Sequence, residues 1–352
     1  KVLAIGGWGD AYKNTVPQLV DALPDAKGIV GPWVHKYPHF AVPEPRIGFL
    51  QEALRWWDRW LKGIDNGIMD EPRLHYYLMD SVPPATDYQH RSGRWQSESR
   101  WPSAGIGQDR FYLHPKGLSK TVFEKRHSAT VSSPETVGKM AGKLMVGIGH
   151  EKEFPGDQQQ DDRLSLTFDT DPLEDALNIV GQPRLQVTVS SDRPLANIIV
   201  RLCDVHPSGE STLVTYGVLN LAHRNSNESP QPLTPGKPYE VELALHHIAY
   251  QVPGKHRLRL SISNAYWPLI WPSPFRDTLK IELSESHLTV PVKPEPGQVD
   301  NPALQFFESE PLQVETELRP PQTSKRCFED TQTGTMRSET AVAGGPGAGG
   351  QL

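Results

Sequence analysis

Two short segments near the amino terminus carry an acid and a base of the kind that share a proton in enzymes. Asp10 ends the segment G-G-W-G-D (6–10), and His35 ends the segment G-P-W-V-H (31–35). A carboxylate that holds an imidazole fixes the ring in one tautomer and stabilises its protonated form, as general acid–base catalysis requires. These residue types therefore predict a proton-transferring pair, if the fold brings the two segments together.

Each segment follows an apolar run that predicts a β-strand. The runs are V-L-A-I (2–5) and K-G-I-V-G (27–31), and apolar residues at helical spacing lie between them: Val16, Leu19, Val20 and Leu23. Strand, helix and strand make one crossover unit of a parallel sheet, whose functional residues gather at the carboxyl ends of the strands. On spacing alone, Asp10 equally suits an N-cap of the helix and His35 an ordinary loop histidine.

The expected partner of this pair, a nucleophile, is not found in the sequence. In α/β-hydrolases the triad runs serine, then acid, then histidine along the chain, and only nine residues precede Asp10. No G-x-S-x-G motif occurs, and Ser211 in G-E-S-T lies in a β-rich region where no strand-to-helix turn is expected. The chain therefore carries two members of such a triad and lacks the third.

The residues from about 46 to 62 predict a helix. Its apolar residues recur every three or four positions, and tryptophans widen the stripe: Leu50, Leu54, Trp56, Trp57, Trp60 and Leu61. Gly63 is placed to end it. The aromatic weight predicts that this helix is buried against a sheet.

From about residue 72 the pattern changes to short β-type runs separated by turn signals, which predicts an antiparallel all-β domain, a sandwich or jelly roll. We expect three parts. Residues 1–68 form an α/β part, residues 69–318 form the β domain, and residues 319–352 form a tail too polar and too low in complexity to order itself.

Six segments carry a resemblance to a known family, in family order: G-W-G-D (7–10), G-P-W-V-H (31–35), W-W-D-R-W-L-K-G (56–63), G-R-W…W-P (93–102), G-D-Q-Q-Q-D-D (156–162) and Y-W-P-L-I-W-P-S-P (266–274). The chain resembles the C-terminal half of serine hydrolases of the cocaine esterase and X-Pro dipeptidyl-peptidase group. That resemblance implies an incomplete α/β-hydrolase part followed by a jelly-roll domain. It implies that Asp10 is the triad acid and His35 the triad histidine, with the serine and the substrate-selecting cap before residue 1. Gly9 stands where relatives often have tyrosine, and we expect it to open space beside Asp10.

No cofactor or metal ion is predicted. His39 follows His35 by four residues, but Pro38 argues against a helix that would align the pair. The acids Asp157, Asp161 and Asp162 lack the spacing of a calcium loop, so hydrogen bonds to backbone are the favoured interpretation. His246 and His247 are expected in a strand, on opposite faces. Neither Cys203 nor Cys327 is expected in a disulfide.

The net charge of −6 without a basic stripe argues against a nucleic-acid partner, and no apolar run approaches the ~20 residues of a membrane span. No signal peptide is visible, which favours the cytoplasm. The sequence predicts a serine hydrolase acting on a small ester, an amide or a peptide through an acyl-serine, incomplete as this chain and possible as a homo-oligomer. The alternatives are a non-catalytic binding or structural module, or one chain of a split hydrolase.

Overall fold

The computed structural model describes residues 1–122, 124–146, 154–294, 306–309, 322–330 and 335–343. Among these residues, no helix is long and apolar enough to cross a membrane. The elements in chain order are β1 (Leu3–Gly7), α1 (Thr15–Ala22), β2 (Lys27–Gly31), α2 (Phe49–Leu61), β3 (Leu74–Asp80), β4 (Gly93–Glu98), β5 (Gly107–His114), β6 (Gly117–Ser119), β7 (Ser128–Val131), α3 (Gln159–Asp162), β8 (Leu166–Asp169), β9 (Leu177–Gly181), β10 (Arg184–Ser191), β11 (Asn197–Val205), β12 (Ser211–Asn220), the 3-10 turn Leu221–His223, β13 (Tyr239–Ala244), β14 (Ile248–Val252), β15 (Arg257–Ser263), β16 (Leu279–Val292), β17 (Gln322–Asp330) and β18 (Thr335–Ala343).

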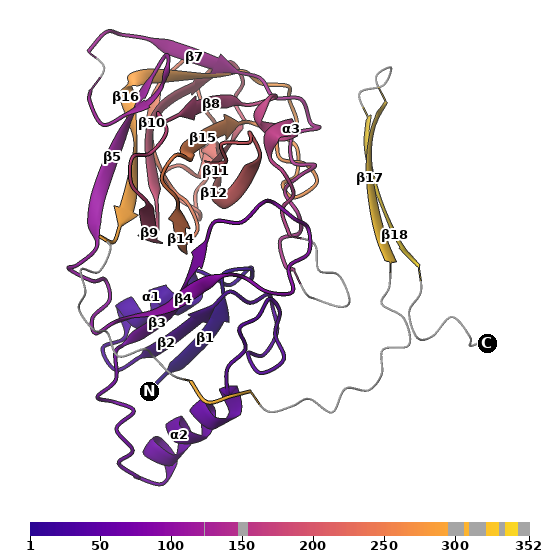
Figure 1. The fold of residues 1–352 in the computed structure, drawn as a ribbon. Helices are drawn as coiled ribbons and strands as arrows, with labels where there is room; N and C mark the ends of the chain where they lie inside the picture. The colour runs from indigo at the N-terminus through magenta and orange to yellow at the C-terminus, as the bar shows by residue number, and fades with distance from the viewer. Residues whose placement is uncertain (123, 147–153, 295–305, 310–321, 331–334, 344–352) are drawn as a thin grey trace.

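The N-terminal region is a small parallel sheet with one packed helix (Figure 1). β1 pairs with β2, and β2 pairs with β3, both in parallel. α1 packs on β1 and β2 through its buried Val16 and Val20. The strand–helix–strand unit predicted over residues 2–31 is present, and it places the loops after β1 and β2 at the same edge of the sheet.

The same sheet continues into the β-rich part without a break at residue 68. β3 pairs in parallel with β14, which pairs in turn with β9, and the sheet then runs through β16 and β10 to β13. β4 adds to β3, while β5 and β7 pair with β16. β3 thus pairs both with β2 of the N-terminal region and with β14 of the β-rich part. The domain boundary expected between residues 68 and 69 therefore falls inside one continuous sheet.

A second sheet of four strands, ordered β12-β11-β15-β8, faces the large one. The core between the two sheets holds apolar residues with no exposed area, such as Ile198 and Leu202 of β11, Leu260 of β15 and Ile281 of β16. As predicted, the chain from about residue 72 is rich in short strands. The chain is therefore mostly β, with a small α/β region at its amino end.

The helix predicted over residues 46–62 forms as α2, but the prediction that its apolar stripe is buried is wrong for most of that stripe. Exposed fractions reach 56% at Leu54, 53% at Trp57 and 75% at Leu61. Only Glu52 and Trp56 of this helix are buried. In Figure 1, α2 lies apart from the strands of the sheet. Arg55 of this helix bonds both Glu52 and Glu71.

The C-terminal tail differs in part from expectation. β17 and β18 pair as an antiparallel hairpin within residues 319–352, where no ordered structure was predicted. The two strands form backbone hydrogen bonds with each other. Such pairing does not require a high apolar content, which was the basis of the prediction. A two-stranded hairpin by itself is marginally stable in water. The rest of the predicted tail lies outside the described residues.

Candidate active site

Asp10 and His35 meet at the carboxyl edge of the parallel sheet. The His35 Nδ1 atom lies 2.9 Å from the Asp10 Oδ2 atom, within hydrogen-bond distance. The Asp10 side chain is largely buried, with 11% of its area exposed, whereas 44% of the His35 side chain is exposed. A buried acid behind an accessible imidazole leaves the second ring nitrogen, Nε2, as the atom that other groups can approach.

Close contact between the two loops produces this arrangement. A Cβ atom at Gly7 would lie only 2.1 Å from the Trp33 carbonyl oxygen, so the loops can approach this closely because residue 7 is glycine. The Gly9 N–H donates to the same Trp33 oxygen at 2.9 Å. Trp8 anchors the first loop to β3, because its indole N–H donates to the Tyr77 carbonyl at 2.8 Å.

Asp10 does not cap the following helix. α1 begins at Thr15 after Asn14, and no side-chain hydrogen bond caps it. The Oδ1 atom of Asp10 instead accepts the Tyr12 backbone N–H at 3.0 Å, a local turn that fixes the carboxylate with its other oxygen toward His35. The Tyr12 ring lies 5.7 Å from the His35 ring. Sequence reasoning missed this contact, whose one signal is an aromatic residue two positions after the acid.

A hollow of about 830 Å³ opens in front of the pair. It lies between β1 and α2, and its lining includes Asp10, His35, Tyr37, Phe49 and Trp56. None of the described residues that line it is a serine. The hollow thus presents His35 to an apolar space, without a nucleophile from this part of the chain.

Gly9 lines the smaller cavity described below, but the direction that a side chain at this position would take is crowded. A Cβ atom at this position would lie 3.0 Å from the Trp33 carbonyl oxygen and 3.1 Å from the Phe154 Cε1 atom. Both neighbours come from outside the G-W-G-D segment. The room that a tyrosine would need is therefore already occupied on this side of the loop.

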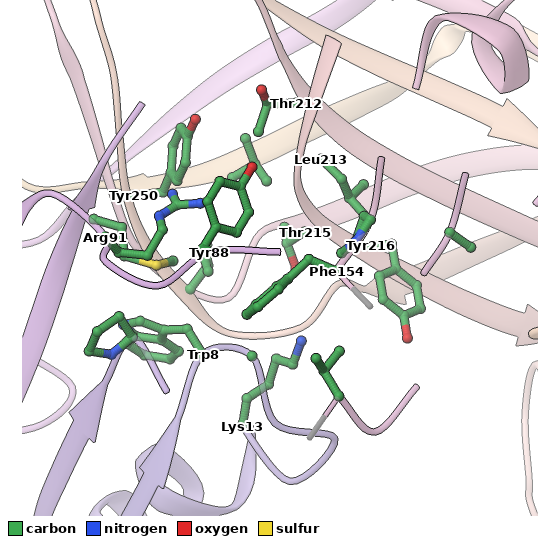
Figure 2. Close-up of a pocket in the computed structure, with 18 of the residues that line it drawn as sticks. Trp8, Lys13, Tyr88, Arg91, Phe154, Thr212, Leu213, Thr215, Tyr216 and Tyr250 are labelled. Atoms are coloured by element: carbon green, nitrogen blue, oxygen red, sulfur yellow. The ribbon is translucent and has the colours of Figure 1, made fainter. Parts of the chain in front are cut away.

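A second, smaller cavity of about 100 Å³ lies on the other side of the same loop, between it and the β12 and β14 strands (Figure 2). Trp8, Lys13, Tyr88 and Phe154 are among the side chains around it. Burial lowers the pKa of Lys13 to about 8, while nearby Asp10 acts in the opposite direction. Neither Asp10 nor His35 lines this cavity, so it is separate from the hollow in front of the pair.

The other candidate residues have structural partners. Ser211 is fully buried and donates from its hydroxyl to Asp162 at 2.8 Å, so it is not an exposed nucleophile. Asp157 and Asp161 accept backbone N–H groups, as expected. Asp162 instead pairs with the arginines Arg201 and Arg259, each at 3.0 Å.

The structure also shows the surroundings of His39, His246, His247 and Cys203. The His39 ring stacks on the Phe49 ring, with the two ring centroids 5.6 Å apart. His246 and His247 are not in a strand as expected, because β13 ends at Ala244 and β14 begins at Ile248. Both bind Asn14 of the N-terminal region instead. Cys203 is a buried free thiol.

Comparison with known proteins identifies relatives of this chain. Residues 66–296 match the family described as the X-Pro dipeptidyl-peptidase C-terminal non-catalytic domain. The cocaine esterase of a Rhodococcus species is 23% identical over 292 residues, which cover 76% of this chain and 49% of the esterase. The chain spans about half the length of the curated relatives it matches.

Solved structures share the fold. An aminopeptidase from a marine sediment archaeon superposes with a TM-score of 0.63 at 17% identity, covering 83% of this chain and 55% of the other. A CocE/NonD family hydrolase from Staphylococcus aureus gives a TM-score of 0.62 at 14% identity, covering 83% of this chain and 54% of the other. Since the family match covers well over half of the chain, the chain belongs to the family of the X-Pro dipeptidyl-peptidase C-terminal non-catalytic domain.

Proposed function

We propose that this chain supplies the acid and the base of a serine hydrolase whose nucleophile comes from outside these 352 residues. The observation that carries the proposal is the 2.9 Å contact between His35 Nδ1 and Asp10 Oδ2 at the ends of two parallel strands. In α/β-hydrolases the acid and the histidine follow the serine along the chain. Residues 1–68 then form the last part of an α/β-hydrolase domain, and residues 69–318 a jelly-roll domain attached to it.

The surfaces around the pair support an additional segment. β1 pairs with β2 on one side, and its other edge borders the hollow of about 830 Å³. The apolar stripe of α2 is exposed at Leu50, Leu54, Trp57 and Leu61. Among the described residues, that other edge of β1 pairs with no strand. A strand edge of this kind and an exposed apolar stripe are surfaces that proteins normally cover. Further strands added to β1 would cover both and carry a serine toward His35.

In the complete site each residue has one task. The Nε2 atom of His35 takes the proton of the serine hydroxyl as that oxygen attacks the substrate carbonyl, and it returns the proton to the leaving group. Asp10 holds the Nδ1–H and stabilises the imidazolium that forms. Water, activated by the same imidazole, then hydrolyses the acyl-serine. The names of the relatives support a carboxylic ester or a peptide bond as the substrate.

The second candidate, a non-catalytic module, draws on the family match, because that family is described as a non-catalytic domain. Its residues 66–296 begin after both Asp10 and His35. The match therefore describes the β-rich part, and the acid–base pair lies outside it. A purely structural role does not account for the contact between the buried Asp10 carboxylate and the exposed His35 ring.

The test compares the 352-residue chain with the longest protein that its gene encodes. We expect the longer protein to hydrolyse p-nitrophenyl acetate and to be labelled by a fluorophosphonate at a serine outside these residues, identified by mass spectrometry. We expect neither result for the chain alone. Labelling at a serine of the chain alone would contradict the proposal, and so would a longer protein that is folded but inert towards both reagents. If the gene encodes only this chain, the same assays with co-purified partner proteins test the split form.

A further inference from the structure

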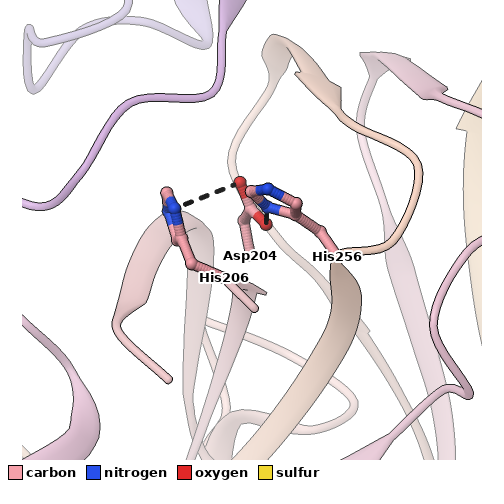
Figure 3. Close-up of side chains that lie close together, drawn as sticks. All are labelled: Asp204, His206 and His256. Atoms are coloured by element: carbon pink, nitrogen blue, oxygen red, sulfur yellow. Dashed lines mark hydrogen bonds and ion pairs between the residues drawn. The ribbon is translucent and has the colours of Figure 1, made fainter. Parts of the chain in front are cut away.

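A carboxylate and two imidazoles converge at one end of the four-stranded sheet, far along the chain from Asp10 and His35 (Figure 3). Asp204 lies near the end of β11, and His206 follows that strand directly. His256 immediately precedes β15, which pairs with β11 so that Asp204 lies opposite Leu258. One potential ligand atom from each of the three residues lies within 4.8 Å of the other two.

The distances suit a metal ion at the centre of the three. His256 Nδ1 lies 2.7 Å from Asp204 Oδ1, and His206 Nε2 lies 3.8 Å from Asp204 Oδ2. In a tetrahedral zinc site with bonds of about 2.0–2.1 Å, the ligand atoms lie about 3.3 Å from one another. The two observed distances bracket that value.

Neighbouring hydroxyl groups already orient the ligands. The Asp204 Oδ2 atom accepts hydrogen bonds from the Ser81 hydroxyl at 2.5 Å and from the Tyr250 hydroxyl at 2.9 Å. Thr212 donates from its hydroxyl to the Val82 carbonyl, and its oxygen lies 2.9 Å from His206 Nε2. The Ser81 and Tyr250 bonds fix the carboxylate, as outer partners do at metal sites, whereas a metal ion would replace the bond that His206 Nε2 makes to Thr212.

The charge of Asp204 also calls for a cation. Its side chain has no exposed area, and its hydroxyl partners, Ser81 and Tyr250, are neutral. A buried carboxylate is costly unless a positive charge or a metal ion compensates it. Two imidazoles, whose ring centroids are only 4.6 Å apart, would repel each other if both were protonated. His256, whose Nδ1 atom lies 2.7 Å from Asp204 Oδ1, supplies a positive charge only when it is protonated, whereas one divalent ion between the three side chains would supply it with both rings neutral.

We propose that Asp204, His206 and His256 bind a divalent transition metal ion of the zinc type. Two imidazoles and one carboxylate suit Zn²⁺, Co²⁺ or Ni²⁺ better than Mg²⁺ or Ca²⁺, which prefer oxygen ligands. Three protein ligands leave a fourth position for water or another ligand. The Ser81 contact joins the end of β3 to this site, so the ion would also link the large sheet to the four-stranded one. The proposal is independent of the proposed function.

The test uses the full chain, freed of any affinity tag and treated with a chelator. We expect titration with Zn²⁺ to show one equivalent bound and to raise the melting temperature. Mg²⁺ at the same concentration should do neither. His206→Gln and His256→Gln should each weaken Zn²⁺ binding at least ~10-fold, since removing an outer partner alone costs ~10- to 100-fold. His223→Gln, a histidine of the 3-10 turn Leu221–His223, is the matched control and should bind as the unaltered protein does.

Binding that does not saturate, or that is unchanged in both ligand variants, would overturn the proposal. A pair of histidines elsewhere, such as His246 and His247, would give the latter result. If a variant fails to fold by circular dichroism, crystals of the unaltered protein grown with Zn²⁺ decide the question through anomalous diffraction at the zinc edge. A peak among Asp204, His206 and His256 supports the site. A map with no peak there shows that the three residues form a hydrogen-bonded cluster alone.

Discussion

The N-terminal region and the β-rich region differ in how far their apolar side chains are buried. In the β-rich region, Ile198, Leu202 and Leu260 have no exposed area, because the two facing sheets cover each other's inner sides. In the N-terminal region, Leu54 and Trp57 of α2 are more than half exposed, and β1 is an edge strand beside a hollow. The β-rich region therefore closes its own core, whereas the N-terminal region presents surfaces suited to a further segment.

The acid–base pair lies in the region whose apolar surfaces stay open. Asp10 and His35 line the hollow along β1, while the other cavity on the far side of their loop lacks both. The Asp10–His35 pair, which lacks a nucleophile among the described residues, thus lies beside the apolar surface that a further segment would cover. Substitutions in each region test whether the two regions differ in this way.

The largest effect is expected in the buried ion-pair cluster of the β-rich region. Asp162 is 4% exposed and pairs with Arg201 and Arg259, each at 3.0 Å. Asp162→Ala leaves two arginines without this partner, and breaking a buried pair costs about 3–5 kcal/mol. We expect urea unfolding to report that loss. Asp171→Ala, an exposed acid nearby in the chain, should change the free energy of unfolding by less than ~0.5 kcal/mol. Equal small losses in both variants would mean that the cluster does not hold this region together.

A pair of leucines compares the two regions directly. Leu260→Ala removes a side chain with no exposed area and should lower the free energy of unfolding by about 2–5 kcal/mol. Leu54→Ala removes one that is 56% exposed, and we expect a change within ~0.5 kcal/mol. Urea unfolding of the chain alone measures both. A large loss for Leu54→Ala would show that the stripe of α2 is already packed within this chain, which removes one support of the proposal.

The contact between the two regions predicts a pH dependence. Burial lowers the pKa values of His246 and His247 to about 4, from an ordinary value of 6.5. Between these values the unfolded chain binds protons that the folded chain does not, so stability falls as the pH drops from about 6.5 towards 4. At pH 5 each histidine contributes a loss of about 2 kcal/mol. Burial raises the pKa of Asp277 to about 6, which acts in the opposite direction over the same range.

Urea unfolding at pH 7 and pH 5 checks this dependence. His247→Gln should remove about 2 kcal/mol of the loss between the two pH values. His223→Gln, again the matched control, should leave the loss unchanged. A loss of the same size in His247→Gln would mean that this histidine is already accessible in the folded chain, and that its contact with Asn14 does not fix the two regions together.

The sequence predicted helices and strands well because the spacing of apolar residues and the turn residues act within short segments of the chain. Alternation and turn residues placed strands such as β10, β11 and β15, and the acid and histidine at strand ends were recognised before their contact was known. Burial depends on what covers an element, so the apolar stripe of α2 predicted a core position although most of the stripe is exposed.

The parts that were missed depend on contacts between distant segments. His256 lies 52 residues from Asp204, and no spacing rule joins them; only the pairing of β11 with β15 does. His246 and His247 were expected in a strand but lie between β13 and β14. Both bind Asn14, more than 230 residues away in the chain, and no local pattern predicts that contact.

The most direct test of the central claim is the turnover of the longest protein that the gene encodes when His35 is replaced. His39 is the matched control, because it lies four residues away and packs on Phe49 rather than on Asp10. If His35 moves the proton, His35→Ala should lower kcat for p-nitrophenyl acetate by at least ~10³-fold, whereas His39→Ala should stay within a few fold. Near-normal turnover by a folded His35→Ala protein would contradict the proposed role of the Asp10–His35 pair.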